Sequence, residues 1–342
     1  MPPGPGHSQS RSTQRPQRRS RRDPASTSGQ RNSTRQVNQQ ARWEVPKPLA
    51  TAEAHMADGS CIVLRRHGNT SGPRLVLSHC NGFAADAYYP FWSLLTDRFD
   101  VVLFDLRNHG WNPVGSGEDH HVGTFVEDHA TIGRAIDRNF SDKPKIGVFH
   151  SVSAQSALIH ASRESAYSAL VLFDPVVCPP GCRSEDVEKV EKVLGQLGQA
   201  ALKRRERFAS LEEFMDRVLR APGFRLLCPG APELIARATR RPAADGDGYE
   251  LCCPREYEAR VSLEGPRWAR AADLSRVSCP VKIVGSDPVV PFSFLPTVDL
   301  REILAIDYDF VPDTTHLLQL EMPAECVAAM MPFVERCLTE AS

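Results

Sequence analysis

The sequence predicts an α/β protein in which helices cover both faces of a mostly parallel sheet, with an inserted helical segment. Two observations support this prediction. Short runs of four to six apolar residues, rich in Val, Ile, Leu and Phe, alternate with stretches of helical spacing. Residues 178–272 interrupt the alternation with helix-forming sequence that contains no apolar run of this kind.

Each apolar run ends in a polar or turn residue, as expected of strands that are buried on both faces. The runs are "CIVLRRHG" (61–68), "RLVLSH" (74–79), "DVVLFDLR" (100–107), "KIGVFHS" (145–151), "ALVLFDP" (169–175) and "VKIVGSDP" (281–288). Helical spacing covers 122–140, 152–164 and 323–338. Ligands of such sheets bind at the carboxyl ends of the strands, so the polar residues there are candidates for a site.

The composition changes twice along the 342 residues. Residues 1–43 hold nine arginines and one acidic residue with almost no aliphatic side chain, which predicts a disordered basic tail. Residues 44–177 and 273–342 are predicted to form the α/β core, and residues 178–272 a helical cap inserted into it. Because the net charge of the whole chain is −1, the part after the tail is acidic.

Several classes of protein are disfavoured by composition. The chain has no run of ~18 apolar residues for a membrane span and no secretory leader, which favours a cytoplasmic location. A transit peptide in the Arg-rich tail stays open, whereas no aromatic residues are interleaved with its arginines for nucleic-acid stacking. The ten cysteines are scattered without zinc spacing, so we expect reduced thiols and no metal site.

Three polar residues have the types and order of a nucleophilic triad. Ser151 lies where the strand in "GVFHSVSAQSAL" runs into a helix, and His316 lies in "PDTTHLLQLEMP" before the last helix. A serine nucleophile needs a base to take its proton and an acid to orient that base. Asp287, at the end of "VKIVGSDP", is the predicted acid, and Asp174 after "ALVLFDP" is the alternative.

Five segments together carry a family resemblance: "LSHCNGF", "FDLRNHG", "FHSVSA", "VGSDPVVP" and "THLLQLEMP". From about residue 58 to residue 338 the chain resembles the α/β-hydrolases that carry a helical cap. The resemblance implies a nucleophile elbow at Ser151, with Asp287 and His316 completing the triad. It also implies an oxyanion hole made by the backbone N–H groups of Val152 and Asn81, with Phe83 as the alternative to Asn81.

The elbow departs from the usual pattern of this family. Glycine normally stands two residues before and two after the nucleophile, because neighbouring backbone comes close there. In this chain those positions hold Phe149 and Ser153. Phe149 would need a gap in a facing element, and His150 is expected to point away from the pocket because strand neighbours face opposite sides.

The residues and the resemblance together predict a cofactor-independent serine hydrolase. Its substrate would be a small ester, lactone or thioester, cleaved through an acyl-enzyme. Two alternatives remain: a C–C bond hydrolase or non-haem haloperoxidase with the same triad, and a ligand sensor with slow or no turnover. The sensor alternative rests on the resemblance of "HSVSA" to elbows of hormone receptors and of a stress regulator in this family.

Overall fold

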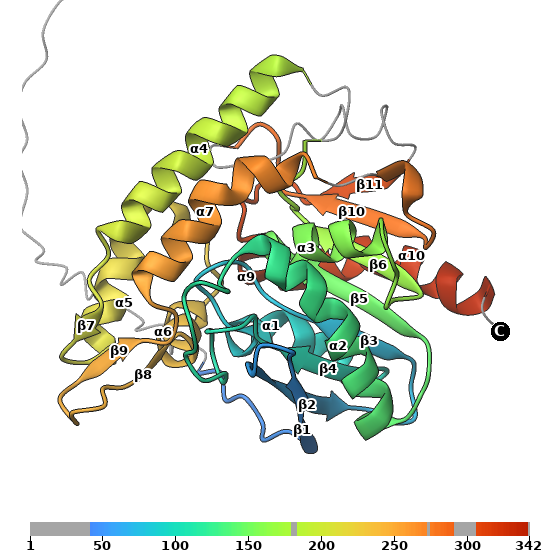
Figure 1. Ribbon diagram of the computed structural model, residues 1–342, viewed down its shortest axis with the longest axis horizontal. Helices are drawn as coiled ribbons and strands as arrows, with labels where there is room; N and C mark the ends of the chain where they lie inside the picture. The colour runs from blue at the N-terminus through green and yellow to red at the C-terminus, as the bar shows by residue number, and fades with distance from the viewer. Residues whose placement is uncertain (1–41, 179–182, 272–273, 291–305, 341–342) are drawn as a thin grey trace, which may run out of the picture. The chain divides into compact units, whose positions relative to one another are not determined.

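The computed structural model describes residues 42–178, 183–271, 274–290 and 306–340 (Figure 1). The prediction for residues 1–43 therefore lies almost entirely outside the described residues. The rest forms one compact unit built on an eight-stranded sheet with the strand order β1-β2-β4-β3-β5-β6-β10-β11.

The sheet is antiparallel at one edge and parallel elsewhere. Pairs β1–β2 and β2–β4 are antiparallel, and the five pairs from β4 to β11 are parallel. Its strands are β1 (Ala50–His55), β2 (Cys61–Gly68), β3 (Arg74–Leu77), β4 (Asp100–Phe104), β5 (Lys145–His150), β6 (Ala169–Phe173), β10 (Val281–Gly285) and β11 (Asp307–Phe310). The predicted fold class is confirmed, while the two edge strands β1 and β11 were not predicted. Half-exposed edge strands have no continuous apolar run, so they give a weak signal.

Helices cover both faces of the sheet and create two hydrophobic cores. On one face, α2 (Val122–Phe140) and α3 (Val152–Ala161) pack on side chains that include Val102, Leu170 and Ile283. In Figure 1 these two helices lie in front of the sheet and α10 (Pro323–Glu340) lies behind it. The helices predicted from spacing are thus present, and none of the described helices is long and apolar enough to cross a membrane.

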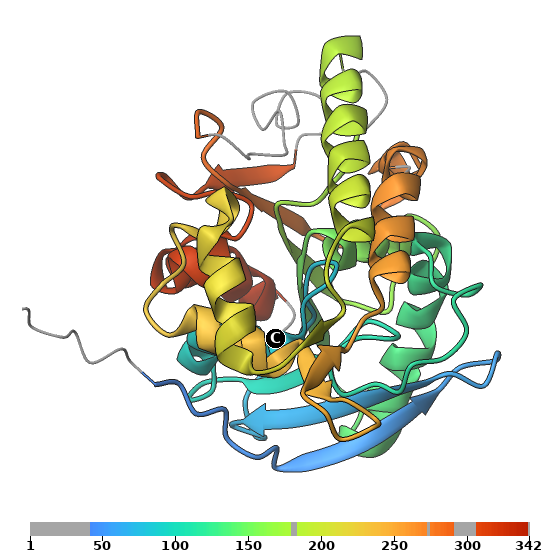
Figure 2. The same ribbon diagram turned by 90° about the vertical axis from the view of Figure 1, so that its left-hand side faces the viewer.

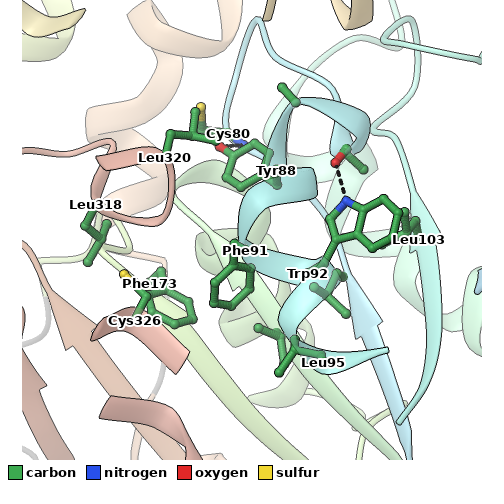
Figure 3. Packing of buried hydrophobic residues seen from close by; sticks show 14 of the residues in the cluster. Cys80, Tyr88, Phe91, Trp92, Leu95, Leu103, Phe173, Leu318, Leu320 and Cys326 are labelled. Atoms are coloured by element: carbon green, nitrogen blue, oxygen red, sulfur yellow. Dashed lines mark hydrogen bonds between the residues drawn. The ribbon is translucent and has the colours of Figure 1, made fainter. Parts of the chain in front are cut away.

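The second core holds the segment that leads from β3 to β4. Figure 3 shows Phe91, Trp92 and Leu95 packed beside Leu103 and Phe173. Phe91 and Trp92 belong to α1 (Tyr89–Trp92) and Leu95 to η2 (Ser93–Leu95), and both elements follow η1 (Ala85–Tyr88). Helix α9 (Leu318–Glu321) packs on the same core. The indole N–H of Trp92 donates to the carbonyl of Ala85 at 3.1 Å, so this buried polar group is satisfied. This core lies directly under the loop that follows β3.

The segment between β6 and β10, described over residues 183–271 and called the insertion below, is mainly helical. It contains α4 (Ser184–Leu202), α5 (Leu211–Arg220), α6 (Ala231–Ala238) and α7 (Arg255–Ala269), with η3 (Pro222–Phe224). Helices α4 and α7 run side by side in both views (Figure 2). A three-stranded sheet, β7-β9-β8, was not predicted: β7 (Arg207–Phe208), β8 (Arg240–Pro242) and β9 (Tyr249–Leu251) are too short to give a periodic pattern.

We predict that acid unfolds this protein well above the pH at which carboxylates titrate. Burial lowers the pKa of His67 to about 4 and of His109 to about 3. The same cause lowers the pKa of His79, His120, His129, His150 and His160. Below pH ~6.5 the unfolded chain binds protons that the folded chain does not, which costs about 1.4 kcal/mol per pH unit for each histidine.

All seven shifts have the same direction, so their effects add, and they act against a net stability of only about 5–15 kcal/mol. We therefore expect the urea midpoint, followed by circular dichroism, to be constant above pH ~7 and to fall steeply between about pH 6.5 and 5. A midpoint unchanged from pH 7 to 5.5 would show that these histidines are not held neutral in the folded chain.

Candidate active site

Ser151 lies in a strained turn between β5 and α3. Its backbone has φ 57° and ψ −119°, a conformation that L-residues rarely adopt and that often marks a functional turn. The N–H of Ser151 donates to the carbonyl of Phe173 on β6 at 2.9 Å, which holds the turn against the neighbouring strand. The turn therefore presents the Ser151 side chain at the carboxyl end of the sheet, at the start of a helix.

The structure shows how the elbow accommodates two residues that are not glycine. The ring of Phe149 folds back over Gly147, where an added Cβ would lie 2.4 Å from the ring. The space that Phe149 needs is therefore provided on β5 itself by Gly147, two residues earlier on the same face of the strand. At the second position, Ser153 Oγ donates to the carbonyl of His150 at 2.9 Å and accepts from the His150 N–H at 3.1 Å. Its buried hydroxyl closes the turn through these two hydrogen bonds.

His316 connects the elbow to a buried carboxylate. Its Nε2 lies 2.9 Å from Ser151 Oγ, and its Nδ1 lies 2.5 Å from Asp174 Oδ2. Asp174 directly follows β6, has φ 40° and is fully buried. Because Asp174 is an acceptor, Nδ1 carries the hydrogen, and Nε2 is left to accept the serine proton. This hydrogen-bonded chain of serine, histidine and aspartate is the arrangement that activates a serine hydroxyl.

Asp287 does not have the position that the sequence suggested. Its carboxylate accepts hydrogen bonds from the backbone N–H groups of Val289 at 3.0 Å and Asp313 at 2.9 Å. The prediction is therefore corrected: Asp174, not Asp287, hydrogen-bonds to Nδ1 of His316. Both aspartates end parallel strands at the same edge, but β6 is next to β5 in the sheet whereas β10 is one strand further away. Through the Asp313 N–H, Asp287 instead stabilises the loop that leads to His316.

The loop after β3 supplies backbone N–H groups close to the elbow, because Leu77 pairs with Val148 in the sheet. The Gly82 N–H donates to His109 Nε2 at 3.0 Å, and the Phe83 N–H donates to the Cys80 carbonyl at 3.2 Å. In the described part of the chain, no acceptor pairs with the N–H of Asn81 or of Val152, the first residue of α3. Of the predicted donors, Asn81 and Val152 thus keep their N–H groups available, and Phe83 does not.

The insertion contacts this same loop. Asn81 Nδ2 donates to the carbonyl of Glu258 on α7 at 2.8 Å. The Glu258 carboxylate is buried against Gly82, whose φ of 75° and close neighbours leave no room for a side chain. Arg204 pairs with Glu258 at 2.5 Å, so this buried charge is compensated. The insertion therefore packs directly over the loop that carries Asn81.

A second buried carboxylate supports the backbone beside His316. Glu321 accepts from the Thr315 N–H at 2.7 Å and from the Thr315 hydroxyl. Burial raises the pKa of Glu321 above its ordinary value, and the Thr315 hydrogen bonds oppose that shift. Because Thr315 directly precedes His316, these hydrogen bonds restrict the backbone that carries His316.

Three residues of metal-binding type, two histidines and one cysteine, meet at the junction of the core and the insertion. One ligand atom each of His109, His120 and Cys253 lies within 4.8 Å of the others, and all three residues are buried. However, His109 Nδ1 is bonded to the Arg107 carbonyl and its Nε2 accepts from Gly82. Both ring nitrogens of His109 are thus occupied. Metal binding through His109 would have to break one of these two hydrogen bonds.

Sequence reasoning did not find four side chains that hold the site together: Ser153, Glu321, Tyr88 and His150. Tyr88 and His150 hydrogen-bond to each other, and His150 Nε2 also bonds to the carbonyl of His316 at 2.7 Å. His150 therefore does not point away from the site as expected. Only the presence of a small hydroxyl residue at 153 could have signalled the closed turn, because the other contacts join residues far apart in sequence.

The chain is similar to a known protein family and to several solved structures. The model of the alpha/beta hydrolase family matches residues 75–329. The E-2-(acetamidomethylene)succinate hydrolase structure is 19% identical, with a TM-score of 0.65, and the match covers 84% of this chain and 99% of that one. A thioesterase domain from the curacin biosynthetic pathway is 18% identical, with a TM-score of 0.61 and coverage of 83% and 99%.

A thermophilic esterase from Thermogutta terrifontis, solved with malate bound, is 18% identical with a TM-score of 0.56, covering 84% of this chain and 99% of its own. No curated protein sequence matches the chain. At these identities the solved structures establish a shared fold. The family match covers most of the chain, from β3 to α10, and agrees with the sheet order and the strand–turn–helix at Ser151. The chain belongs to the alpha/beta hydrolase family.

Proposed function

We propose that the protein is a serine hydrolase that cleaves a small ester, lactone or thioester through an acyl-enzyme. Ser151 is the nucleophile, His316 the general base and acid, and Asp174 the residue that orients His316. The observation that carries the proposal is the continuous hydrogen-bonded chain from Ser151 Oγ through both ring nitrogens of His316 to Asp174. These side chains are sufficient for acyl transfer without a cofactor.

The reaction follows from the positions of the protons. His316 Nε2 accepts the Ser151 proton while Oγ forms a bond to the carbonyl carbon, and negative charge develops on the carbonyl oxygen. The N–H groups of Asn81 and Val152 stabilise that charge, and Val152 adds the positive end of the α3 dipole. His316 then gives the proton to the leaving group, which departs and leaves acyl-Ser151. A water molecule, deprotonated by His316, repeats the attack, and Ser151 regains its proton.

The elbow can be tested without knowing the substrate. A fluorophosphonate reacts when the serine oxygen displaces fluoride from phosphorus, which requires both an activated nucleophile and an oxyanion hole. We expect one covalent adduct on Ser151, located by mass spectrometry of the digested protein. Ser151→Ala is the control and should give no adduct. A folded wild-type protein that is not modified at Ser151 would contradict the proposal.

A panel of acyl substrates separates a hydrolase from a ligand sensor. The panel would vary the leaving group (alcohol, phenol, thiol) and the length of the acyl chain, together with simple lactones. Multiple turnovers on a member of this panel, lost in Ser151→Ala, support the hydrolase. Stoichiometric labelling of Ser151 with at most one turnover on every member would instead favour a ligand sensor.

A further inference from the structure

A tyrosine and a histidine that the triad does not contain are bonded to each other inside the site. Tyr88 Oη lies 2.6 Å from His150 Nδ1, and both side chains are buried. The Tyr88 hydroxyl also accepts a hydrogen bond from the Cys80 N–H at 3.2 Å. Figure 3 shows Tyr88 beside Cys80 in the second core, to which both residues belong. At its other ring nitrogen, His150 reaches the backbone carbonyl of His316 at 2.7 Å.

The direction of each hydrogen bond can be assigned. The His316 carbonyl can only accept, so His150 Nε2 carries the hydrogen and Nδ1 is the acceptor. Tyr88 O–H therefore donates to Nδ1 and accepts from Cys80 through a lone pair. Burial keeps both groups neutral, because it lowers the pKa of His150 well below its ordinary value and raises the pKa of Tyr88 well above its own. Each donor in this hydrogen-bonded chain has an acceptor, and each hydrogen bond polarises the next.

The chain of bonds joins three parts of the site that are far apart in sequence. Cys80 directly precedes Asn81, the proposed oxyanion donor, and His150 directly precedes Ser151. The third contact is the main chain of His316 itself. The rings of His150 and His316 also pack against each other with centroids 4.8 Å apart. A shift of the tyrosine hydroxyl would thus move the oxyanion donor, the nucleophile and the base relative to one another.

We propose that Tyr88 and His150 are positioning residues for the hydrolase reaction, which set the distance from Ser151 to His316 and to the Asn81 N–H. This inference rests on the proposed function. The two residues would act through the groups that they hold in place and not through a bond to the substrate. Misplacement of reacting groups by about 1 Å can cost a factor of ~100 in rate, so loss of this chain should appear mainly in the chemical step.

The substitution Tyr88→Phe removes one oxygen atom and keeps the ring. It leaves the Cys80 N–H and His150 Nδ1 without a partner in a buried site. We expect the second-order rate of fluorophosphonate labelling of Ser151 to fall about 10- to 100-fold. With a turned-over ester, kcat should fall by a similar factor while KM changes little.

The chain contains a matched control on the opposite face of the sheet. Tyr167 Oη lies 2.8 Å from Nδ1 of His129, whose Nε2 lies 3.0 Å from Ser156 Oγ, and all three residues are buried. Tyr167→Phe therefore removes the same hydroxyl from the same kind of partner, in the core between α2 and α3. Both variants should lose thermal stability, because each leaves a buried histidine nitrogen without its partner, but only Tyr88→Phe should lose labelling rate.

Conservative replacement at His150 adds a second test. His150→Gln keeps a side-chain N–H that can donate to the His316 carbonyl, whereas His150→Ala keeps no polar atom. We expect His150→Gln to recover part of the rate that His150→Ala loses. In the double variant Tyr88→Phe/His150→Ala the losses should be less than multiplicative, because both substitutions break one chain.

The outcomes separate this inference from the proposed function. If the wild-type protein labels on Ser151 but Tyr88→Phe labels at the same rate, the positioning role is wrong and the hydrolase proposal stands. If Tyr167→Phe loses as much rate as Tyr88→Phe, the effect is general destabilisation and the inference is also wrong. If the folded wild-type protein does not label at all, the proposed function itself has failed.

Discussion

Replacing Ser151 or His316 with alanine is expected to reduce kcat by about six orders of magnitude, with the fold intact. In the proposed mechanism, no acyl-enzyme can form without Ser151 Oγ, and without His316 Nε2 the hydroxyl has no acceptor for its proton. Because the two side chains act as one unit, the double variant should be no slower than either single variant. Turnover of a panel ester by highly purified protein measures the effect.

At the same position, a substitution that removes activity is expected to increase stability. A residue with a side chain at φ 57° and ψ −119° costs about 1–3 kcal/mol of backbone strain, which glycine avoids. We therefore expect Ser151→Gly to raise the unfolding midpoint above that of Ser151→Ala while both lack turnover. If Ser151→Gly were less stable than Ser151→Ala, the turn would not store the strain that its dihedral angles indicate.

The second large effect is expected at Asp174. An asparagine there can donate a hydrogen bond to His316 Nδ1, which places the ring hydrogen on Nε2 and removes the acceptor that Ser151 needs. We expect Asp174→Asn to lower kcat by about 10⁴-fold with little change in KM. Steady-state kinetics on the best panel substrate would measure this effect, with circular dichroism to confirm folding.

Asp287→Asn is the matched control for this substitution. Its carboxylate accepts from the N–H groups of Val289 and Asp313, and asparagine can still satisfy one of them through its oxygen. One backbone N–H then loses its acceptor, which costs about 1–3 kcal/mol of stability. Turnover should stay within several-fold of the wild type. The assignment of Asp174 as the acid would be wrong if Asp174→Asn stayed active and Asp287→Asn lost turnover by about 10⁴-fold.

Much of the architecture was accessible before the structure because buried parallel strands have a strong local signal. Six apolar runs each became a strand of the large sheet, and the stretch 122–140 became α2 with the predicted bounds. Such runs must bury both faces, so no exposed arrangement competes with the sheet. The short strands β7, β8 and β9 and the edge strands escaped because partners elsewhere in the chain, not a local pattern, make them strands.

The elbow illustrates where local pattern and tertiary contact part. The missing glycines at positions 149 and 153 made the motif doubtful in the sequence. In the structure, the ring of Phe149 lies over Gly147, and the hydroxyl of Ser153 bonds to both backbone groups of His150. The motif tolerates Phe149 because Gly147 leaves space for its ring. It tolerates Ser153 because the hydroxyl is hydrogen-bonded to the backbone of the turn.

The sequence by itself determined the fold class and the residue types at the carboxyl edge of the sheet, since both follow from short apolar runs and the polar residues that end them. Only the tertiary structure decided which aspartate meets His316. Asp174 and Asp287 end similar strands, and spacing along the chain does not report which strand lies beside β5. The same holds for Tyr88 and His150, whose hydrogen bonds depend on the sheet order that brings distant loops together.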